Sequence, residues 1–175
     1  KANVLGQVKS WVDDGLKPRA VTRDLDWGVK VPVEGADGKV LYVWLDALTN
    51  YISALNYPDK DDPLFKDYWP ASIHLIGKDI LRFHAIYWPA FLMSVGLELP
   101  SKVFAHGMIL DGEGHKMSKS LGNVIDPLKF VKKFGVDEFR YFLIAGGSYG
   151  EDMNFSEAMF AEKINNESFS IQLNL

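Results

Sequence analysis

Two short apolar segments, separated by a glycine turn and a stretch of helix length, constrain the fold of this chain more than any other feature. Residues 72–76 predict a buried strand, residues 80–95 a helix, and residues 102–109 a second apolar strand. A strand, helix and strand in this order form a βαβ unit, whose two strands run parallel and are buried on both faces. The sequence therefore predicts an α/β fold, with a ligand site beyond the strand ends, near residues 77–79 and 106–109.

The segments around this unit carry weaker signals. Val4, Val8 and Val12 recur at helical spacing, and Gly15 ends the predicted first helix. The other predicted elements, in chain order, are a loop at 18–26, a β-hairpin made of residues 29–33 and 40–46, a helix at 47–55, a loop at 57–70, a turn at 111–114, helices at 127–134 and 137–145, and a last helix that opens at Ser156 and Glu157 and runs to the end of the chain.

Composition limits the kinds of site that the chain can hold. The 175 residues contain no cysteine, which excludes disulfides and thiolate metal ligands. None of the four histidines has a zinc-ligand spacing, so we expect no metal site. The net charge of −4 argues against a nucleic-acid partner, but residues 116–133 hold five lysines against one acid, a stripe that fits phosphates. The most apolar segment, residues 85–97, is too short to span a bilayer.

The sharpest local motif is the run Lys116-Met117-Ser118-Lys119-Ser120, followed by Leu121-Gly122-Asn123. Two ammonium groups three residues apart, with hydroxyls and a glycine around them, can close over a triphosphate and supply both charge and hydrogen bonds. The alternative interpretation is a solvated basic loop that binds nothing.

This five-residue run is similar to the signature loop of the class I aminoacyl-tRNA synthetases, and it follows a βαβ unit, as it does in that class. Three other segments resemble the methionyl-tRNA synthetase family: Arg23-Asp24-Leu25-Asp26-Trp27-Gly28, Val43-Trp44-Leu45-Asp46-Ala47 with Tyr51, and Gly77-Lys78-Asp79-Ile80 with Phe83-His84 and Trp88-Pro89. The resemblance covers residues 3–166. Residues 168–172 depart from the family, and Leu48-Thr49-Asn50 stands where many bacterial members have Pro-x-Gly.

The resemblance implies two binding sites. It implies a methionine pocket formed by Trp44, Ala47, Tyr51, Ile80, His84 and Trp88, where aromatic rings favour a thioether. It implies an ATP site formed by Gly77, Asp79, Met108, Ile109, Lys116, Ser118 and Lys119, with Lys119 and Lys116 as the catalytic pair. Spacing alone favours core packing for Trp44, Trp88 and His84. A helix-capping role stays open for Asp79, and His106 is expected to be a core or strand-end residue rather than a catalytic one.

The resemblance also implies how the α/β fold is divided. It implies the second half of a Rossmann-type parallel-sheet nucleotide-binding domain, a small stem-contact region and the start of an α-helical anticodon-binding domain. Residues 1–41 would end an inserted connective region with its return hairpin. Residues 42–109 would be the Rossmann half, 110–158 the lysine-loop and stem-contact region, and 159–175 the start of the helical domain.

The implied activity is Mg²⁺-ATP-dependent activation of methionine and its transfer to tRNA(Met), the initiator tRNA included. The location would be cytoplasmic, with an organellar copy as an open alternative, and no membrane is involved. The chain lacks the H-x-G-H element of the class and starts at Lys1, so we expect an incomplete portion that is inactive by itself. Zinc, if present, would belong to the missing upstream insertion. The sequence does not indicate the oligomeric state.

Two other functions remain open. One is a different lysine-loop synthetase, of the cysteinyl or leucyl type. The other is a tRNA-binding or regulatory paralogue that keeps the fold without the chemistry.

Overall fold

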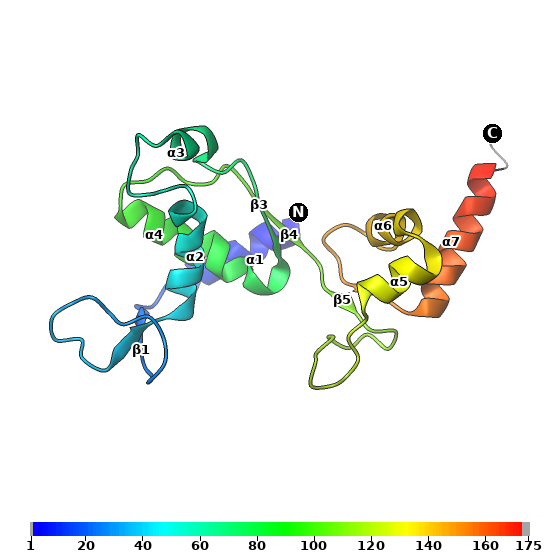
Figure 1. The fold of residues 1–175 in the computed structure, drawn as a ribbon, viewed down its shortest axis with the longest axis horizontal. Helices are drawn as coiled ribbons and strands as arrows, with labels where there is room; N and C mark the ends of the chain where they lie inside the picture. Colours follow the sequence, from blue (N-terminus) through cyan, green and yellow to red (C-terminus); the bar gives the residue numbers. More distant parts are fainter. Residues whose placement is uncertain (1, 173–175) are drawn as a thin grey trace. The chain divides into compact units, whose positions relative to one another are not determined.

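The computed structural model describes residues 2–172 and divides into two compact units, Lys1–Phe104 and Ala105–Leu175 (Figure 1). The first unit opens with helix α1 (Ala2–Asp13). Gly15 follows the helix with a φ of 86°, and its N–H donates to the carbonyl of Val12 over 3.0 Å. A glycine in the left-handed region is a common helix end, as the sequence predicts here.

The β-hairpin differs from its prediction. Strand β2 (Lys39–Leu41) pairs antiparallel with β1 (Thr22–Asp24), a segment that was expected to be a loop. Residues 29–31 lie along the other edge of β2, joined by a single bridge between Lys30 and Val40. Val40 is the buried residue of β2, 5% exposed. The strand therefore forms where two segments can pair on either side of Val40, which short-range sequence patterns do not reveal.

Helix α2 (Val43–Ser53) begins four residues earlier than predicted, so the expected strand at 43–46 is wrong. Tyr42 is the extended residue before the helix, and its carbonyl accepts from the N–H of Leu45 over 2.8 Å. Leu48 and Ile52 are buried one turn apart, and Trp44 packs against the same core. This four-residue period on one face favours a helix over the β-rich composition of the segment.

The predicted strand–helix–strand unit is present. Strand β3 (His74–Gly77) leads into a helical segment made of a short 3₁₀ turn η1 (Lys78–Ile80), a π-helical stretch η2 (Phe83–Tyr87) and α4 (Trp88–Ser94). Strand β4 (Val103–His106) follows and is the sheet neighbour of β3. Two backbone hydrogen bonds, from Ser101 N–H to the Ala71 carbonyl and from His74 N–H to the Lys102 carbonyl, advance in the same direction along both segments, as in parallel pairing.

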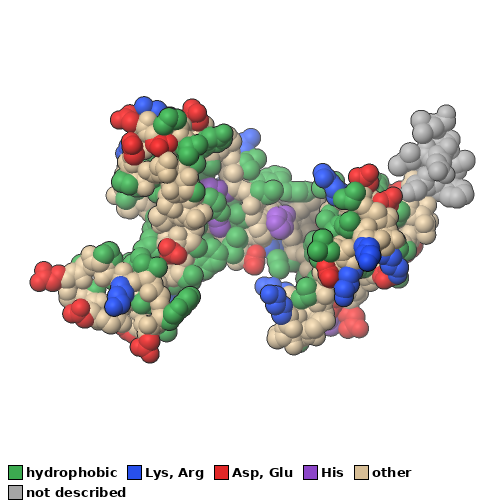
Figure 2. Space-filling view, viewed as in Figure 1, with side chains coloured by type: hydrophobic (Ala, Val, Ile, Leu, Met, Phe, Trp, Pro, Cys, Tyr) green, Lys and Arg blue, Asp and Glu red, His purple; other side chains and the backbone are tan. Residues whose placement is uncertain are grey.

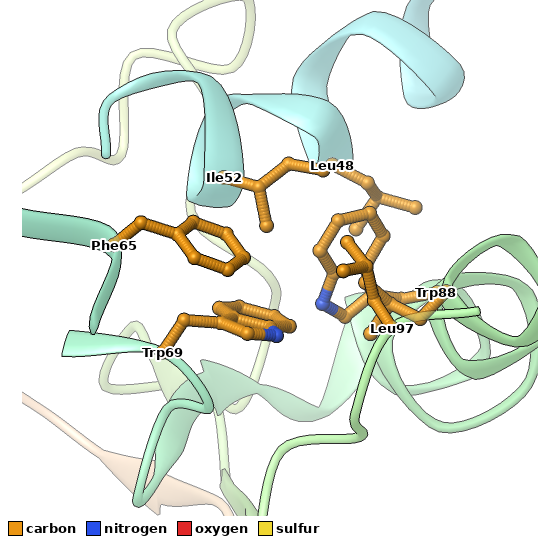
Figure 3. Packing of buried hydrophobic residues seen from close by; sticks show 7 residues of the cluster. Leu48, Ile52, Phe65, Trp69, Trp88 and Leu97 are labelled. Carbon is orange, nitrogen blue, oxygen red and sulfur yellow. The ribbon is translucent and has the colours of Figure 1, made fainter. Parts of the chain in front are cut away.

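The core of the first unit lies between α2, α4 and the short helix α3 (Pro63–Tyr68). Figure 3 shows Leu48 and Ile52 of α2 pointing toward Phe65, Trp69 and Trp88. The buried members of this cluster are Leu48, Ile52, Phe65, Trp69, Trp88, Leu92 and Leu97. Helix α3 lies within the segment 57–70, which was predicted to be a loop, and the Asp62 carboxylate caps it by accepting from the N–H of Leu64.

In the second unit, the predicted strand at 102–109 is broken. Strand β4 ends at His106, and a separate strand β5 (Ile109–Leu110) pairs parallel with β6 (Met153–Asn154). A Cβ on Gly107 would lie 1.8 Å from the carbonyl oxygen of Glu151, so only glycine allows this close approach. The N–H of Met108 donates to the Asp152 carboxylate over 2.8 Å instead of to a strand.

Three helices complete the second unit. Helices α5 (Pro127–Phe134) and α6 (Val136–Ala145) meet at Gly135, close to the predicted bounds, and α7 (Glu157–Gln172) begins after Ser156. The backbone remains helical through residues 168–172, where the sequence departs from the family, while 173–175 lie outside the described residues. These helices surround a cluster of phenylalanines: Phe130, Phe134, Phe139, Phe142, Phe155 and Phe160. No helix within residues 2–172 has the length and apolar character needed to cross a membrane.

Two neighbouring residues of α4 test the packing of the first unit. Leu92 is fully buried, whereas Met93 is 68% exposed. Leu92→Ala leaves a cavity and is expected to lower the free energy of unfolding by about 2–5 kcal/mol. Met93→Ala is the matched control and is expected to change it little. Thermal unfolding of the protein that carries this segment measures both, and equal effects would contradict the assigned core.

Candidate active site

The residues predicted to form a methionine pocket come together from two helical segments. Trp44, Ala47 and Tyr51 lie on α2, and the other three lie between residues 80 and 88. The ring of Tyr51 is 5.7 Å from that of His84 and 6.0 Å from that of Trp88. Trp44 is stacked on Phe83 at 3.9 Å and stands edge-on to His84 at 6.4 Å. These rings therefore form one aromatic cluster.

The hydrogen bonds of His84 fix its tautomer. Its Nδ1 lies 3.0 Å from the carbonyl oxygen of Ile80, which can only accept, so Nδ1 carries a proton. In the neutral ring Nε2 is then the acceptor, and the Tyr51 hydroxyl 2.9 Å away donates to it. Burial raises the pKa of Tyr51, which keeps that hydroxyl protonated. The lone pairs of the Tyr51 oxygen are thus the polar group that this pair can offer to a ligand.

His74 belongs to the same cluster, although sequence reasoning placed it only within a strand. The Trp88 indole N–H donates to His74 Nε2 over 3.1 Å, and the Tyr51 and His74 rings are 4.3 Å apart. His74 is 4% exposed, and burial, with a smaller contribution from His84, lowers its pKa to about 4. The one available signal was its position two residues before the buried Ile76 on β3, which puts both side chains on one face.

The helix that carries His84 and Trp88 is wider than predicted. The N–H of Trp88 bonds to the carbonyl of Phe83, five residues back, in place of the usual four. His84 and Trp88 are both buried, and Ile80 is partly exposed. Trp88 is 1% exposed and is a member of the hydrophobic core, so the structure gives this residue the core packing that its spacing alone favoured.

Ala47 and Tyr51 line a hollow of about 520 Å³ on α2, together with Asp46, Thr49, Asn50 and Ser53. Asp46 also lines a second hollow of about 650 Å³, which reaches across to Arg23, Trp27 and Tyr42. Arg23 lies over the Tyr42 ring at 3.9 Å, and Arg19 donates to the hydroxyls of Tyr42 and Tyr87. Arg23, Trp27 and Tyr42, which line the second hollow, were not among the predicted site residues.

Of the predicted ATP-binding residues, Gly77 and Asp79 lie in the first unit. Gly77 is the extended residue before η1, and Asp79 is exposed within the first helical turn. Gly77 rather than Asp79 therefore holds the N-cap position.

Met108 and Ile109 lie in the second unit, at the break between β4 and β5. The main-chain groups of Met108 are already engaged, because its N–H donates to Asp152 and its carbonyl accepts from the N–H of Met153 over 2.9 Å. A ligand contact at Met108 would therefore need its side chain or the second lone pair of its carbonyl. His106 ends β4, is exposed, and places Nδ1 2.8 Å from the carbonyl oxygen of Gly107.

The lysine loop, residues 116–123, has an inner and an outer side. Met117 packs against the phenylalanine cluster, and the Ser118 N–H donates to the Asn123 side chain over 2.8 Å. Lys116 and Lys119 are exposed on either side of these anchored residues. Figure 2 shows several lysine and arginine side chains over the second unit on the face drawn, and Lys129 and Lys132 of α5 are exposed as well. Within the described residues, no three potential metal-ligating side chains gather into a cluster.

Two elements described above are those of a class I aminoacyl-tRNA synthetase. One is the parallel strand–helix–strand unit, and the other is the lysine loop, whose residues Met117 and Ser118 are anchored within the second unit. A family model described as tRNA synthetases class I (M) matches residues 1–175. The chain therefore belongs to this methionyl family of class I synthetases, as the four sequence motifs predicted.

Relatives with curated sequences and solved structures agree with this family. The methionine–tRNA ligase of Mycobacterium leprae is 52% identical over 162 residues, which are 92% of this chain and 30% of that protein. That of Rhizobium meliloti is 53% identical over 163 residues, 92% and 31% of the two chains. The structure of Mycobacterium tuberculosis methionyl-tRNA synthetase in complex with methionyl-adenylate is 48% identical, with a TM-score of 0.86, and the match covers 94% of this chain and 32% of that one. The chain thus spans about a third of the length of these relatives.

The buried His74 predicts a specific dependence of stability on pH. Its pKa is about 4 in the folded state and 6.5 ordinarily, so between these values the unfolded state binds a proton that the folded state does not. The free energy of unfolding should therefore fall as the pH drops from about 6.5 to about 4.

Replacing His74 with Gln, whose side-chain oxygen can still accept from Trp88, should remove that part of the pH dependence. His106→Gln alters an exposed histidine and serves as the control. Urea unfolding at a series of pH values gives the comparison. Parallel curves for His74→Gln and the unmodified protein would contradict the burial of a neutral imidazole.

Proposed function

We propose that this chain is part of a methionine–tRNA ligase, which activates methionine with Mg²⁺-ATP and transfers it to tRNA(Met), including initiator tRNA. The proposal rests on the family and on the ligand of its solved relative, methionyl-adenylate. The observation that carries it is the lysine loop, in which Lys116 and Lys119 are exposed while Met117 and Ser118 between them are held.

In the proposed reaction, the methionine carboxylate attacks the α-phosphorus of ATP. Methionyl-adenylate forms and pyrophosphate leaves, with Mg²⁺ accompanying the ATP as part of the substrate. Such a phosphoryl-centred displacement needs little covalent help from the protein, so positioning and charge supply most of the rate. Lys119, assisted by Lys116, would neutralise charge that develops on the phosphates, and the Ser118 hydroxyl adds a hydrogen-bonding group. Asp79 would bond the ribose, Gly77 would allow close approach of the nucleotide, and Met108 and Ile109 would flank the adenine.

The aromatic cluster would hold the methionine side chain. Trp44, Tyr51, His84 and Trp88 supply rings, and each sulfur–ring contact contributes about 0.3–1.5 kcal/mol. Ala47 leaves room beside Tyr51 in the hollow on α2, and Ile80 adds apolar surface. The Tyr51 hydroxyl, which donates to His84, presents only lone pairs, so it would repel an acidic or carbonyl side chain more than a thioether.

The finer domain assignment belongs to the same proposal. Residues 1–41 would close an inserted region and 42–109 would form the second half of the Rossmann domain. Residues 110–158 would form the lysine-loop and stem-contact region, and 159–175 would begin the anticodon-binding helices. The histidine half of the active site would come from elsewhere in the protein. We further propose that the reaction takes place in the cytoplasm.

Amino-acid-dependent exchange of pyrophosphate into ATP, measured on the full-length protein, tests the substrate. Methionine should support exchange and cysteine and leucine should not. Norleucine and homocysteine should be the near misses, since an apolar pocket discriminates one methylene by only about 1–3 kcal/mol. Exchange with cysteine or leucine in place of methionine would refute the assignment, and no exchange with any amino acid would favour a binding protein.

Lys119→Ala tests the phosphate role within the same assay. Removing one preorganised positive donor should lower the rate of methionine activation by about two to three decades, or roughly 3–4 kcal/mol. Lys60→Ala is the matched control, because Lys60 is also exposed but lies in the loop before α3. An unchanged activation rate in Lys119→Ala would remove this lysine from the mechanism.

A further inference from the structure

Asn123 joins both ends of the lysine loop through one side chain. Its Oδ1 accepts the N–H of Ser118 over 2.8 Å, and its Nδ2 donates to the Asp111 carboxylate over 2.8 Å and to the Lys116 carbonyl over 3.3 Å. Carboxylate and carbonyl oxygens only accept, so the amide orientation is determined by its neighbours. This side chain, which lies after the two lysines, thus contacts a residue before them, the Lys116 backbone and a residue between them.

The Asp111 carboxylate accepts three hydrogen bonds in this arrangement. Its Oδ2 accepts from Asn123, and its Oδ1 accepts from the N–H groups of Glu113 (3.0 Å) and His115 (2.8 Å). A backbone bond from Asp111 N–H to the His115 carbonyl closes the same turn. The hydrogen bond from Asn123, followed by that from the His115 backbone, lowers the pKa of Asp111 and keeps the carboxylate ionised. A charged acceptor strengthens each of these bonds.

Apolar contacts hold the two flanks of the loop. Met117 and Ile125 both pack against the phenylalanine cluster. Between them, Leu121 is 71% exposed and Gly122 turns the chain with a φ of 68°. The Leu121 N–H donates to the hydroxyl of Ser118, which also bonds that of Ser120. The loop therefore has a defined backbone course, although Lys116 and Lys119 project outward.

We infer that Asp111 and Asn123 form a clasp that sets the backbone of the lysine loop and thereby the positions from which Lys116 and Lys119 reach the phosphates. Asp111 and Asn123 are positioning residues in this scheme and act through the lysines. The inference rests on the proposed function, because it names the geometry that the proposed activation step requires. Long lysine side chains need such a base, since they have many rotamers of their own.

The clasp can be broken and remade by exchanging its two side chains. Asn123→Asp keeps the acceptor for Ser118 but sets a carboxylate against that of Asp111. We expect kcat for methionine-dependent pyrophosphate exchange in the full-length ligase to fall by about 10- to 100-fold. KM for methionine should stay unchanged, because no pocket residue belongs to the loop. Asn165→Asp, an exposed change on α7 with the same chemistry, is the control.

The double variant Asp111→Asn with Asn123→Asp restores a donor and an acceptor between the two positions with their roles reversed. It should recover about tenfold or more of the lost kcat, as coupled residues do. Recovery is the result that separates a clasp from general damage to the loop. Equal losses in the single and double variants would overturn the inference.

Hydrogen exchange gives a readout that does not depend on activity. In Asn123→Asp the amides of residues 111–123 should exchange faster, those of α5 and α6 should exchange as in the unmodified protein, and the double variant should return the loop to slow exchange. Faster loop exchange with unchanged kcat would overturn the positioning role. If Asn123→Asp also speeds the exchange of α5 and α6, Asp111→Asn alone is the variant to measure, since it disturbs the loop less. Full kcat in Asp111→Asn would then overturn the inference. If the unmodified ligase shows no methionine-dependent pyrophosphate exchange, the proposed function is refuted. The hydrogen-exchange result would still show whether Asp111 and Asn123 hold the loop.

Discussion

Helix α2 and the helical segment 78–94 are joined by the packing of Leu48 and Ile52 against Trp88 and Leu92, and the candidate pocket depends on this contact. Tyr51 and His84 come from the same two helices, so the core sets the distance between them. Close-packed interiors deform little. The packing of Trp88 in this core therefore fixes how α2 and the helical segment 78–94 lie against each other, before any ligand binds.

Hydrogen bonds within the aromatic cluster then make this packing specific. Trp88 donates to His74, Tyr51 donates to His84, and His84 donates to the Ile80 carbonyl. Trp88 and His84 are buried, and an unpaired buried donor costs much more than a paired one contributes, so these bonds favour one arrangement of the rings over its alternatives. The π-helical turn at 83–87 fits this role, since such turns redirect side chains within a helix.

In the second unit, apolar packing and hydrogen bonds hold the lysine loop. Lysines that engage phosphates must be exposed, yet their backbone must be placed. Met117 and Ile125 pack against the phenylalanine cluster, and Asp111 with Asn123 holds the polar side of the loop. The phenylalanine cluster thus supports the lysine loop in the way that the first core supports the aromatic cluster.

The sequence alone determined those features whose causes are local. Gly135 separates α5 from α6, and an apolar segment makes β3. The charge and spacing of Lys116 and Lys119 left a solvated basic loop open, and only the resemblance to the class I signature loop favoured phosphate binding. Resemblance to a family then named the pocket residues. Tertiary structure decided the three-residue β1, the helical start of α2 at Val43, the place of His74 beside Tyr51, and the bond between Asp111 and Asn123. Each of these depends on a partner far along the chain or on burial, and short-range periodicity carries no information about which distant segments will meet.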